Sequence, residues 1–200
     1  MVDWITDIIS SLNYWGIALL MVLENIFPPL PSEVIMPLAG FTANQGKLRL
    51  LWVIVSGVIG SVLGALPWYY VGRTVGEKRL KRWADRHGKW LTVSGEDIDK
   101  SKRWFNKYGG SVVFFGRLIP AIRTLISIPA GLEDMSFFPF LLYSTIGTFL
   151  WVGLLAYAGY LLGENYQLVK QYLGPVTIVV IAAIAIALSI WFIRRKRKQK

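Results

Sequence analysis

The chain consists of long apolar segments separated by shorter polar ones. The clearest segment is residues 174–193, "GPVTIVVIAAIAIALSIWFI", which contains no charged residue. At about 1.5 Å per residue, a helix of this length spans the roughly 30 Å hydrocarbon core of a bilayer. Residues 50–72 and 136–162 are also long and apolar enough to span. The pattern therefore predicts an all-α integral membrane protein.

Two further apolar stretches are interrupted by proline, and each half contains only 11 to 14 residues. Helices this short are typical of re-entrant or interfacial segments. In the first stretch Pro28, Pro29 and Pro31 remove three backbone donors, which favours a hairpin over the alternative, a kinked full-length helix. We predict two re-entrant hairpins, with halves at 14–27 and 32–43 in the first and at 109–119 and 121–132 in the second.

The two halves of the chain resemble each other. At an offset of 87 residues, segment 60–77 aligns with segment 147–164 and six positions are identical. At an offset of 91, Pro29, Ala39 and Gly40 match Pro120, Ala130 and Gly131. We interpret this as an internal repeat of one broken hairpin followed by one full helix.

Basic residues are concentrated in two places. Of 22 Lys and Arg residues, 11 lie between Arg73 and Lys107 and six in the tail 194–200. Basic segments directly beside apolar helices mark cytoplasmic loops, so the two hairpins are expected to enter from opposite faces. Such an inverted repeat is typical of transporters. Because the basic residues flank apolar helices, the net charge of +10 does not indicate nucleic-acid binding.

We expect one membrane domain over residues 1–200 with a cytoplasmic C-terminus. The first Lys or Arg is Lys47, so the N-terminus lacks the basic region of a signal peptide and should be retained. The expected parts are repeat one at about 14–76, a cytoplasmic amphipathic loop at 77–107, repeat two at about 108–163, a transmembrane helix at 174–193 and a basic tail at 194–200.

Few residues suited to catalysis or metal binding are present. The chain has no cysteine, and its one histidine, His87, lies among Lys and Arg in the basic loop. This excludes a disulfide, a thiolate nucleophile and a cysteine metal site. We expect neither an enzyme nor a cofactor.

Four charged residues lie inside the broken hairpins. Glu24 follows Gly16 by eight residues, as Arg117 follows Gly109, and Glu33 and Arg123 each follow a proline break. Ionisable groups in membrane segments normally pair with each other or line a substrate path. Two converging guanidinium groups would bind a phosphate, and Glu33 would compete for them or carry a proton. The alternative is a structural salt bridge that joins the hairpins.

The stretches "LENIFPPLPSEVIMPLAGF" and "FFGRLIPAIRTLISIPAGLEDMSFFPF" resemble the DedA family of bacterial membrane proteins, whose core is also called the VTT or SNARE-associated domain. The resemblance covers about residues 10–165 and implies a lipid transporter. Family members are similar to flippases and scramblases that move undecaprenyl phosphate or phosphatidylethanolamine across the cytoplasmic membrane. Their essential acid corresponds to Glu33 and their essential arginines to Arg117 and Arg123. The second acid that some members carry about a dozen residues later is absent from "FTANQGK".

We therefore expect a flippase for a lipid phosphate in the bacterial cytoplasmic membrane, with undecaprenyl phosphate for envelope synthesis as the first candidate substrate. Its substrate-binding residues would be Arg117, Arg123, Glu33 and Glu24, and protons are a second candidate partner. The alternatives within transport are a phosphatidylethanolamine scramblase and a proton-coupled exporter. Outside transport, the alternatives are a membrane enzyme acting on lipid phosphates and a structural scaffold.

Overall fold

A computed structural model describes the helical part of the chain around the predicted repeats. The described residues are 2–26, 31–75, 103, 105, 107–120 and 122–165. They form helices and no strands, in agreement with the all-α class expected from the sequence. The predicted loop at 77–107 lies mostly outside the described residues, and the predicted helix at 174–193 and tail at 194–200 lie entirely outside them.

Judged by length and composition only, three helices in this part of the chain could cross a membrane. They are α1 (Val2–Ile26), of which Trp4–Ile26 qualifies, α3 (Leu50–Val75) and α8 (Phe137–Leu161). The bounds of α3 and α8 agree closely with the spans predicted from the sequence. Large apolar side chains on both helices, among them Trp52 and Phe138, are exposed. Exposed apolar surface of this kind fits contact with lipid.

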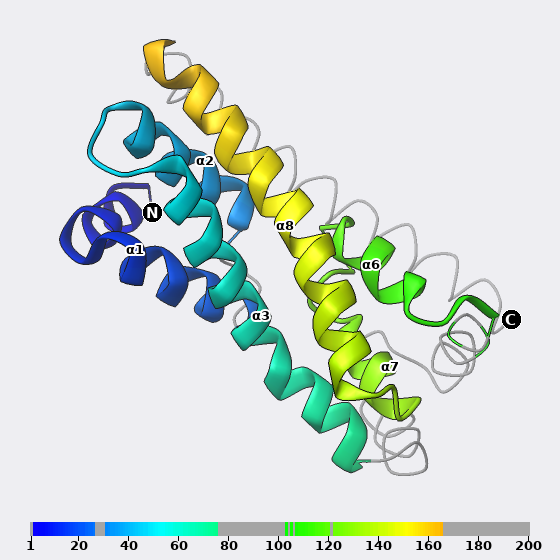
Figure 1. The fold of residues 1–200 in the computed structure, drawn as a ribbon. Coiled ribbons are helices and arrows are strands. Elements are labelled where there is room, and N and C mark those ends of the chain that lie inside the picture. The colour runs from blue at the N-terminus through cyan, green and yellow to red at the C-terminus, as the bar shows by residue number, and fades with distance from the viewer. Residues whose placement is uncertain are drawn as a thin grey trace, which may run out of the picture.

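Helix α1 reverses its direction at Asn13. This residue has φ 51° and ψ −127°, outside the helical region. A Cβ added at Gly16 would lie 2.6 Å from the carbonyl oxygen of Ile8, although eight residues of straight helix rise by about 12 Å. The N-terminal half therefore folds back against the C-terminal half, as Figure 1 shows. The apolar pattern predicted a short half at 14–27, but not the helix before Asn13.

Short helices connect the long ones. Helix α2 (Ser32–Asn44) begins directly after Pro31 and is buried along most of its length. Helices α6 (Ser111–Arg117) and α7 (Ser127–Leu132) flank turns that contain Pro120. A 3-10 helix, Leu162–Asn165, continues α8. Helices α2 and α7 thus follow the prolines that interrupted the apolar pattern, and α6 ends shortly before one.

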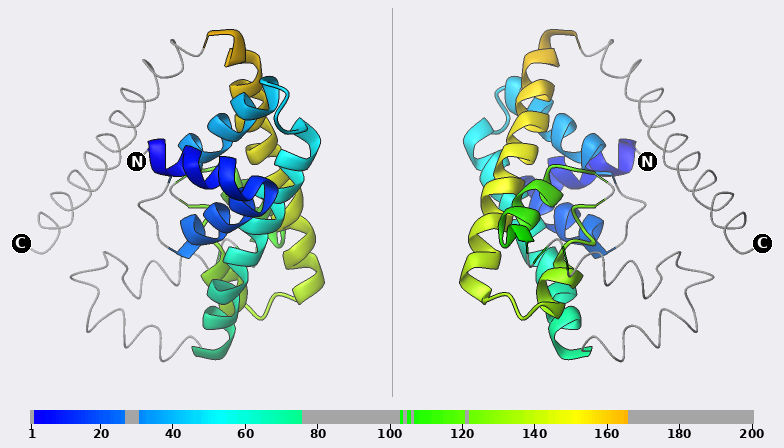
Figure 2. Two further views of the ribbon diagram at one scale, coloured as in Figure 1. Left: turned by 90° about the vertical axis from the view of Figure 1, so that its left-hand side faces the viewer. Right: turned by 90° about the vertical axis from the view of Figure 1, so that its right-hand side faces the viewer.

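The two long helices α3 and α8 lie side by side and run in opposite directions (Figures 1 and 2). Helix α1 packs against α3, and α2 packs against α8. In the second half of the chain, α6 packs against α8 and α7 packs against α3. The first helix of each half, α1 or α6, thus contacts the long helix of its own half, and the second, α2 or α7, contacts the long helix of the other half.

Two apolar clusters fill the spaces between these helices. One cluster is formed by residues of α1, α2, α3 and α8, including Ile17, Met36 and Val152. The other surrounds Tyr69 and Phe140, whose rings stack with centroids 4.4 Å apart. The close packing of these side chains contributes van der Waals contacts that hold the helices together.

Glycines bring the short and long helices into backbone contact. A Cβ at Gly40 in α2 would fall on the carbonyl group of Ala156 in α8, and one at Gly131 in α7 would fall on that of Tyr69 in α3. Gly159 and Gly72 on the long helices meet the carbonyl groups of Pro37 and Ile128 in the same way. Small residues permit such close approach of helices in membranes.

We expect Gly40→Ala to destabilise the protein, because the added methyl group must displace the backbone of α8. Overpacking of this kind costs about 1–3 kcal/mol. Gly153→Ala is the matched control, since Gly153 lies in α8 and a Cβ there would meet nothing within 4 Å. Thermal unfolding in detergent should show a lower Tm for Gly40→Ala and an unchanged or higher Tm for Gly153→Ala. Equal Tm values for the two variants would contradict the close contact.

Candidate functional site

The four charged residues singled out in the sequence lie on three short helical segments and one turn. Glu24 is in the last turns of α1, and Glu33 is in the first turn of α2. Arg117 is the last residue of α6, and Arg123 lies in the turns that connect α6 to α7. Each side chain is therefore placed near the point where a proline interrupts a helical stretch.

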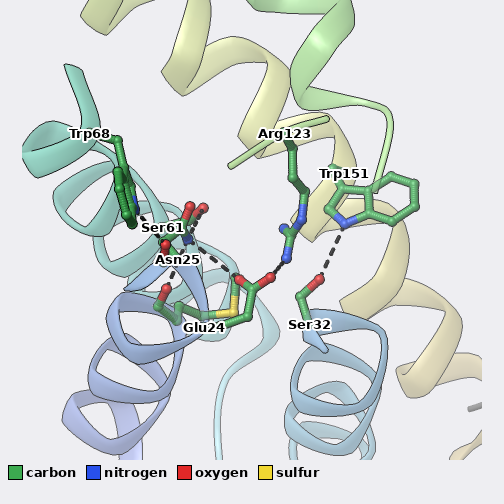
Figure 3. A network of polar contacts seen from close by, with 8 residues as sticks. Glu24, Asn25, Ser32, Ser61, Trp68, Arg123 and Trp151 are labelled. Carbon is green, nitrogen blue, oxygen red and sulfur yellow. Dashed lines mark hydrogen bonds and ion pairs between the residues drawn. The ribbon is translucent and has the colours of Figure 1, made fainter. Parts of the chain in front are cut away.

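Glu24 and Arg123 form a buried ion pair between the two halves of the chain. Arg123 Nη2 donates to Glu24 Oε1, and the side chains of Arg123 and Glu24 are only 5% and 7% exposed. Figure 3 shows the two side chains pointing toward each other from α1 and from the segment before α7. Each charge of a buried pair offsets part of the desolvation cost of the other, and removal of one partner is strongly destabilising.

Asn25 fixes the end of α1 on which Glu24 lies. Its amide nitrogen donates to the carbonyl oxygen of Met21 at 3.0 Å and to Ser61 Oγ on α3 at 3.2 Å, and lies 3.4 Å from Glu24 Oε2. Trp68 Nε1 donates to the carbonyl oxygen of Asn25 at 2.8 Å (Figure 3). These bonds hold the Glu24 carboxylate in place relative to α3.

Arg117 has a different environment, because its guanidinium group meets hydroxyl groups rather than a carboxylate. It is 1% exposed, and Nη2 donates to Ser127 Oγ at 3.0 Å and to Ser144 Oγ at 3.3 Å. The guanidinium carbon also lies 6.0 Å from the centre of the Phe140 ring. Within the described residues, Nε and Nη1 have no hydrogen-bond partner. Buried charges are normally paired, so this arginine has unused capacity to bind an anion.

From the sequence we expected Glu33 to lie beside Arg123. The structure pairs Arg123 with Glu24 instead. Glu33 is partly exposed, and it has no ion-pair partner in the described part of the chain. The preceding residue, Ser32, is fully buried and accepts a hydrogen bond from Trp151 Nε1 on α8 at 3.4 Å. Successive residues on a helix point about 100° apart. Since Ser32 faces α8, Glu33 is turned away, and Glu24 occupies the position opposite Arg123.

The hydroxyl groups around Arg117 were not predicted from the sequence. Ser144 and Thr148 lie four residues apart on α8, and both are buried. Residues four apart share one face of a helix, so two hydroxyl groups at this spacing in an apolar segment could have been used to predict a polar face on α8. Ser127 carried no such signal, because its contact with Arg117 depends on the turns around Pro120.

This set of groups is suited to binding an oxyanion. The guanidinium group is planar, remains charged and forms bidentate bonds with phosphate or carboxylate. Among the described residues, no group of three His, Cys, Asp or Glu side chains could hold a metal ion. The guanidinium and hydroxyl groups offer ionic and hydrogen-bond recognition of an anion.

Comparison with known proteins identifies relatives along nearly the whole chain. The chain is 41% identical to "Alkaline phosphatase-like protein" of Lactococcus lactis subsp. cremoris over 187 residues, which cover 93% of this chain and 87% of that protein. It is 37% identical to "Undecaprenyl phosphate transporter A" of Staphylococcus aureus, with 98% and 97% covered. It is 28% identical to "Protein DedA" of Escherichia coli, with 96% and 89% covered. No solved structure matches the chain significantly.

The VTT domain matches residues 30–161, which include α2, α3, α6, α7 and α8. The matched segment contains Arg117, Arg123 and the hydroxyl groups around Arg117. The extent of this match and the similarity of the relatives show that the chain belongs to the VTT domain family of membrane proteins, the DedA family.

Proposed function

We propose that this membrane protein is a flippase for a lipid phosphate, with undecaprenyl phosphate as the first candidate substrate, in the bacterial cytoplasmic membrane. The observation that carries the proposal is the buried guanidinium group of Arg117, which has open donors and no carboxylate partner among the described residues. Relatives in Staphylococcus aureus and Bacillus subtilis that bear the name undecaprenyl phosphate transporter A support the choice of substrate.

Arg123 is the second arginine of the proposed site, and its charge is neutralised by Glu24 until a ligand replaces that carboxylate. Arg117 receives the phosphate first, since its charge is not neutralised by a nearby carboxylate. Arg123 can then exchange the Glu24 carboxylate for a phosphate oxygen, because both are anions that bind a guanidinium group through charge-assisted hydrogen bonds. Glu24, once released, is the group that would accept a proton. The lipid tail stays in the bilayer throughout.

The proposal includes an inverted repeat of two re-entrant hairpins. Under the offsets found in the sequence, Gly40 and Ala156 correspond to Gly131 and Tyr69, and each glycine meets the partner's carbonyl group in the same way. The opposite directions of α3 and α8 support the inversion (Figure 2). In this topology α3 ends on the cytoplasmic side, α8 begins there, and the C-terminus is cytoplasmic. Broken helices related in this manner form transport sites near the middle of the bilayer.

The topology can be tested with two engineered cysteines. Gln45 and Ser136 are exposed, lie at the start of the segments leading into α3 and α8, and are equivalent under the offset of 91. We expect an impermeant maleimide to label Gln45→Cys in intact cells and Ser136→Cys only after permeabilisation. The cysteine-free parent chain is the control. Labelling of both positions from one side would contradict the inverted repeat.

Transport itself is tested by leaflet exchange of labelled undecaprenyl phosphate in liposomes that contain the purified protein. Arg117→Lys keeps the charge but loses planar bidentate recognition, so we expect exchange to fall about tenfold or more. The variant should remain folded, as judged by its elution in detergent. Exchange at the wild-type rate in Arg117→Lys would show that this arginine does not recognise the phosphate. Release of inorganic phosphate from the lipid would instead favour an enzyme, which the name of the Lactococcus relative brings into consideration.

Charge reversal separates the structural role of the ion pair from its role in transport. Arg123→Ala leaves Glu24 buried without a partner and should cost about 3–5 kcal/mol of unfolding free energy. Glu24→Arg combined with Arg123→Glu should recover most of that stability, but not exchange. Glu33→Gln is the control and should change stability by less than about 0.5 kcal/mol. Wild-type exchange by the reversed pair would mean that the pair has only a structural role.

A further inference from the structure

The N-terminal half of α1, residues 2–12, does not continue in the direction of the half that follows it. The chain reverses at Asn13, and Figure 2 shows the N-terminal half lying across the direction of α3 and α8. The backbone N–H of Arg49 donates to the hydroxyl oxygen of Tyr14 at 3.0 Å, which holds the reversal beside the start of α3. Because α3 has the length and composition of a membrane span, its first turn marks one membrane surface. Residues 2–12 therefore lie at that surface and along it.

One face of this half packs on the rest of the chain, and another face is polar. Ile5 and Ile9 lie four residues apart, are 0% and 1% exposed and belong to the apolar cluster between α1, α2, α3 and α8. The exposed polar residues are Thr6, Asp7, Ser10 and Ser11. Polar and charged side chains are costly in hydrocarbon, so this face is suited to water or lipid headgroups.

A second apolar stripe on the same half is not covered by the described part of the chain. Trp4 and Leu12 are 48% and 47% exposed, and Ile8 lies between them at the same four-residue spacing. Trp15, just after the reversal, is 83% exposed. Tryptophan is enriched at the level of lipid headgroups, where its ring meets apolar groups and its N–H meets polar ones. A polar face beside an apolar stripe with tryptophan is typical of a helix in the membrane interface.

The second half of the chain begins in a similar way. An offset of 93 residues relates Glu24 to Arg117. The same offset pairs Leu12, Asn13 and Gly16 with Phe105, Asn106 and Gly109. Phe105 is buried, and Gly109 interrupts the helix with φ 56°. The similarity between the halves therefore extends to the segments that precede the two hairpins.

The two segments differ in charge. The first contains Asp3 and Asp7, and the first basic residue of the chain is Lys47. The second contains Arg103 and Lys107, which are exposed. Lys and Arg are concentrated on the cytoplasmic side of membrane proteins, so a segment without them suits the opposite face. Interfacial helices bind through buried apolar area and through attraction of basic residues to anionic lipids, and residues 2–12 can use only the first of these.

We propose that residues 2–12 form an interfacial helix that binds the headgroup layer of the outer leaflet through Trp4, Leu12 and Trp15, without selectivity for anionic lipids. The apolar stripe meets the boundary with the acyl chains, and the polar face is turned to water. The helix anchors the start of α1 at the surface, while the proline break after α1 reaches the interior. The choice of leaflet rests on the topology of the proposed function, whereas the position in the interface does not.

The test measures the depth of single labels in the full-length protein in phosphatidylcholine liposomes. Each engineered cysteine carries a nitroxide, and depth is read from its collisions with oxygen and with a water-soluble nickel chelate. We expect Trp4→Cys and Ser11→Cys, which lie seven residues apart on one face, to report the same depth in the headgroup layer. Trp52→Cys and Ile59→Cys in α3 have the same spacing and are about half exposed as wild-type residues, so they are the matched control and should differ by about 10 Å.

A second pair, Asp7→Cys and Ser11→Cys, keeps Trp4 in place and should give the same result. A depth that increases along residues 2–12 as it does along α3 would show a membrane span and overturn the inference, as would labels that lie wholly in water. Addition of phosphatidylglycerol to the liposomes should leave the depths unchanged, and a shift toward the acyl chains would contradict the lack of selectivity.

The leaflet is tested separately in intact cells. We expect an impermeant maleimide to label Ser11→Cys, with the cysteine-free parent chain as the control. Labelling only after permeabilisation, together with equal depths in liposomes, would support the interfacial helix and contradict the topology of the proposed function.

Discussion

Close backbone contact between short and long helices is the constraint on which the rest of the described structure depends. Gly40 and Gly131 allow α2 and α7 to lie directly on carbonyl groups of α8 and α3. Without a hydrophobic driving force in lipid, association of helices relies on such dense packing. The contacts bring the proline-interrupted segments to the middle of the crossed long helices, and only this arrangement lets Glu24 near the end of α1 reach Arg123, about 100 residues later in the chain.

This packing buries two arginines, and their charges are compensated to different extents. Arg123 is compensated by a carboxylate, whereas Arg117 contacts two hydroxyl groups and an aromatic ring. A scaffold that needed only stability would not require the second arginine, because well-packed apolar residues serve as well or better. The uncompensated charge therefore points to binding, and the ordered network around Asn25 shows that the neighbouring carboxylate is held in a fixed position.

The sequence predicted the long helices well because their apolar patterns are long and uninterrupted. The prolines correctly marked where the short helices break, and Arg117 and Arg123 were correctly identified as buried charges. The partner of Arg123 was not predictable, since Glu24 and Glu33 both lie near the break and the direction of each side chain depends on the packing of Ser32 against Trp151. The reversal of α1 at Asn13 was also hidden, because apolar residues continue on both sides of it. The contact of Ser127 with Arg117 was likewise not predictable, because it depends on the turns around Pro120 and not on a periodic sequence pattern.

Only one of the two buried arginines is paired with a carboxylate, so the membrane voltage acts on the charge that remains. Among the residues that the structure describes, two buried guanidinium groups and one buried carboxylate carry one net positive charge. A singly charged phosphate would cancel that charge, and a doubly charged one would reverse its sign. The membrane voltage acts on charges with about 2.3 kcal/mol per elementary charge per 100 mV. If the site moves across the membrane as the proposed transport requires, the voltage acts differently on the empty and the loaded site, and the ionisation state of the phosphate determines which of the two movements it opposes.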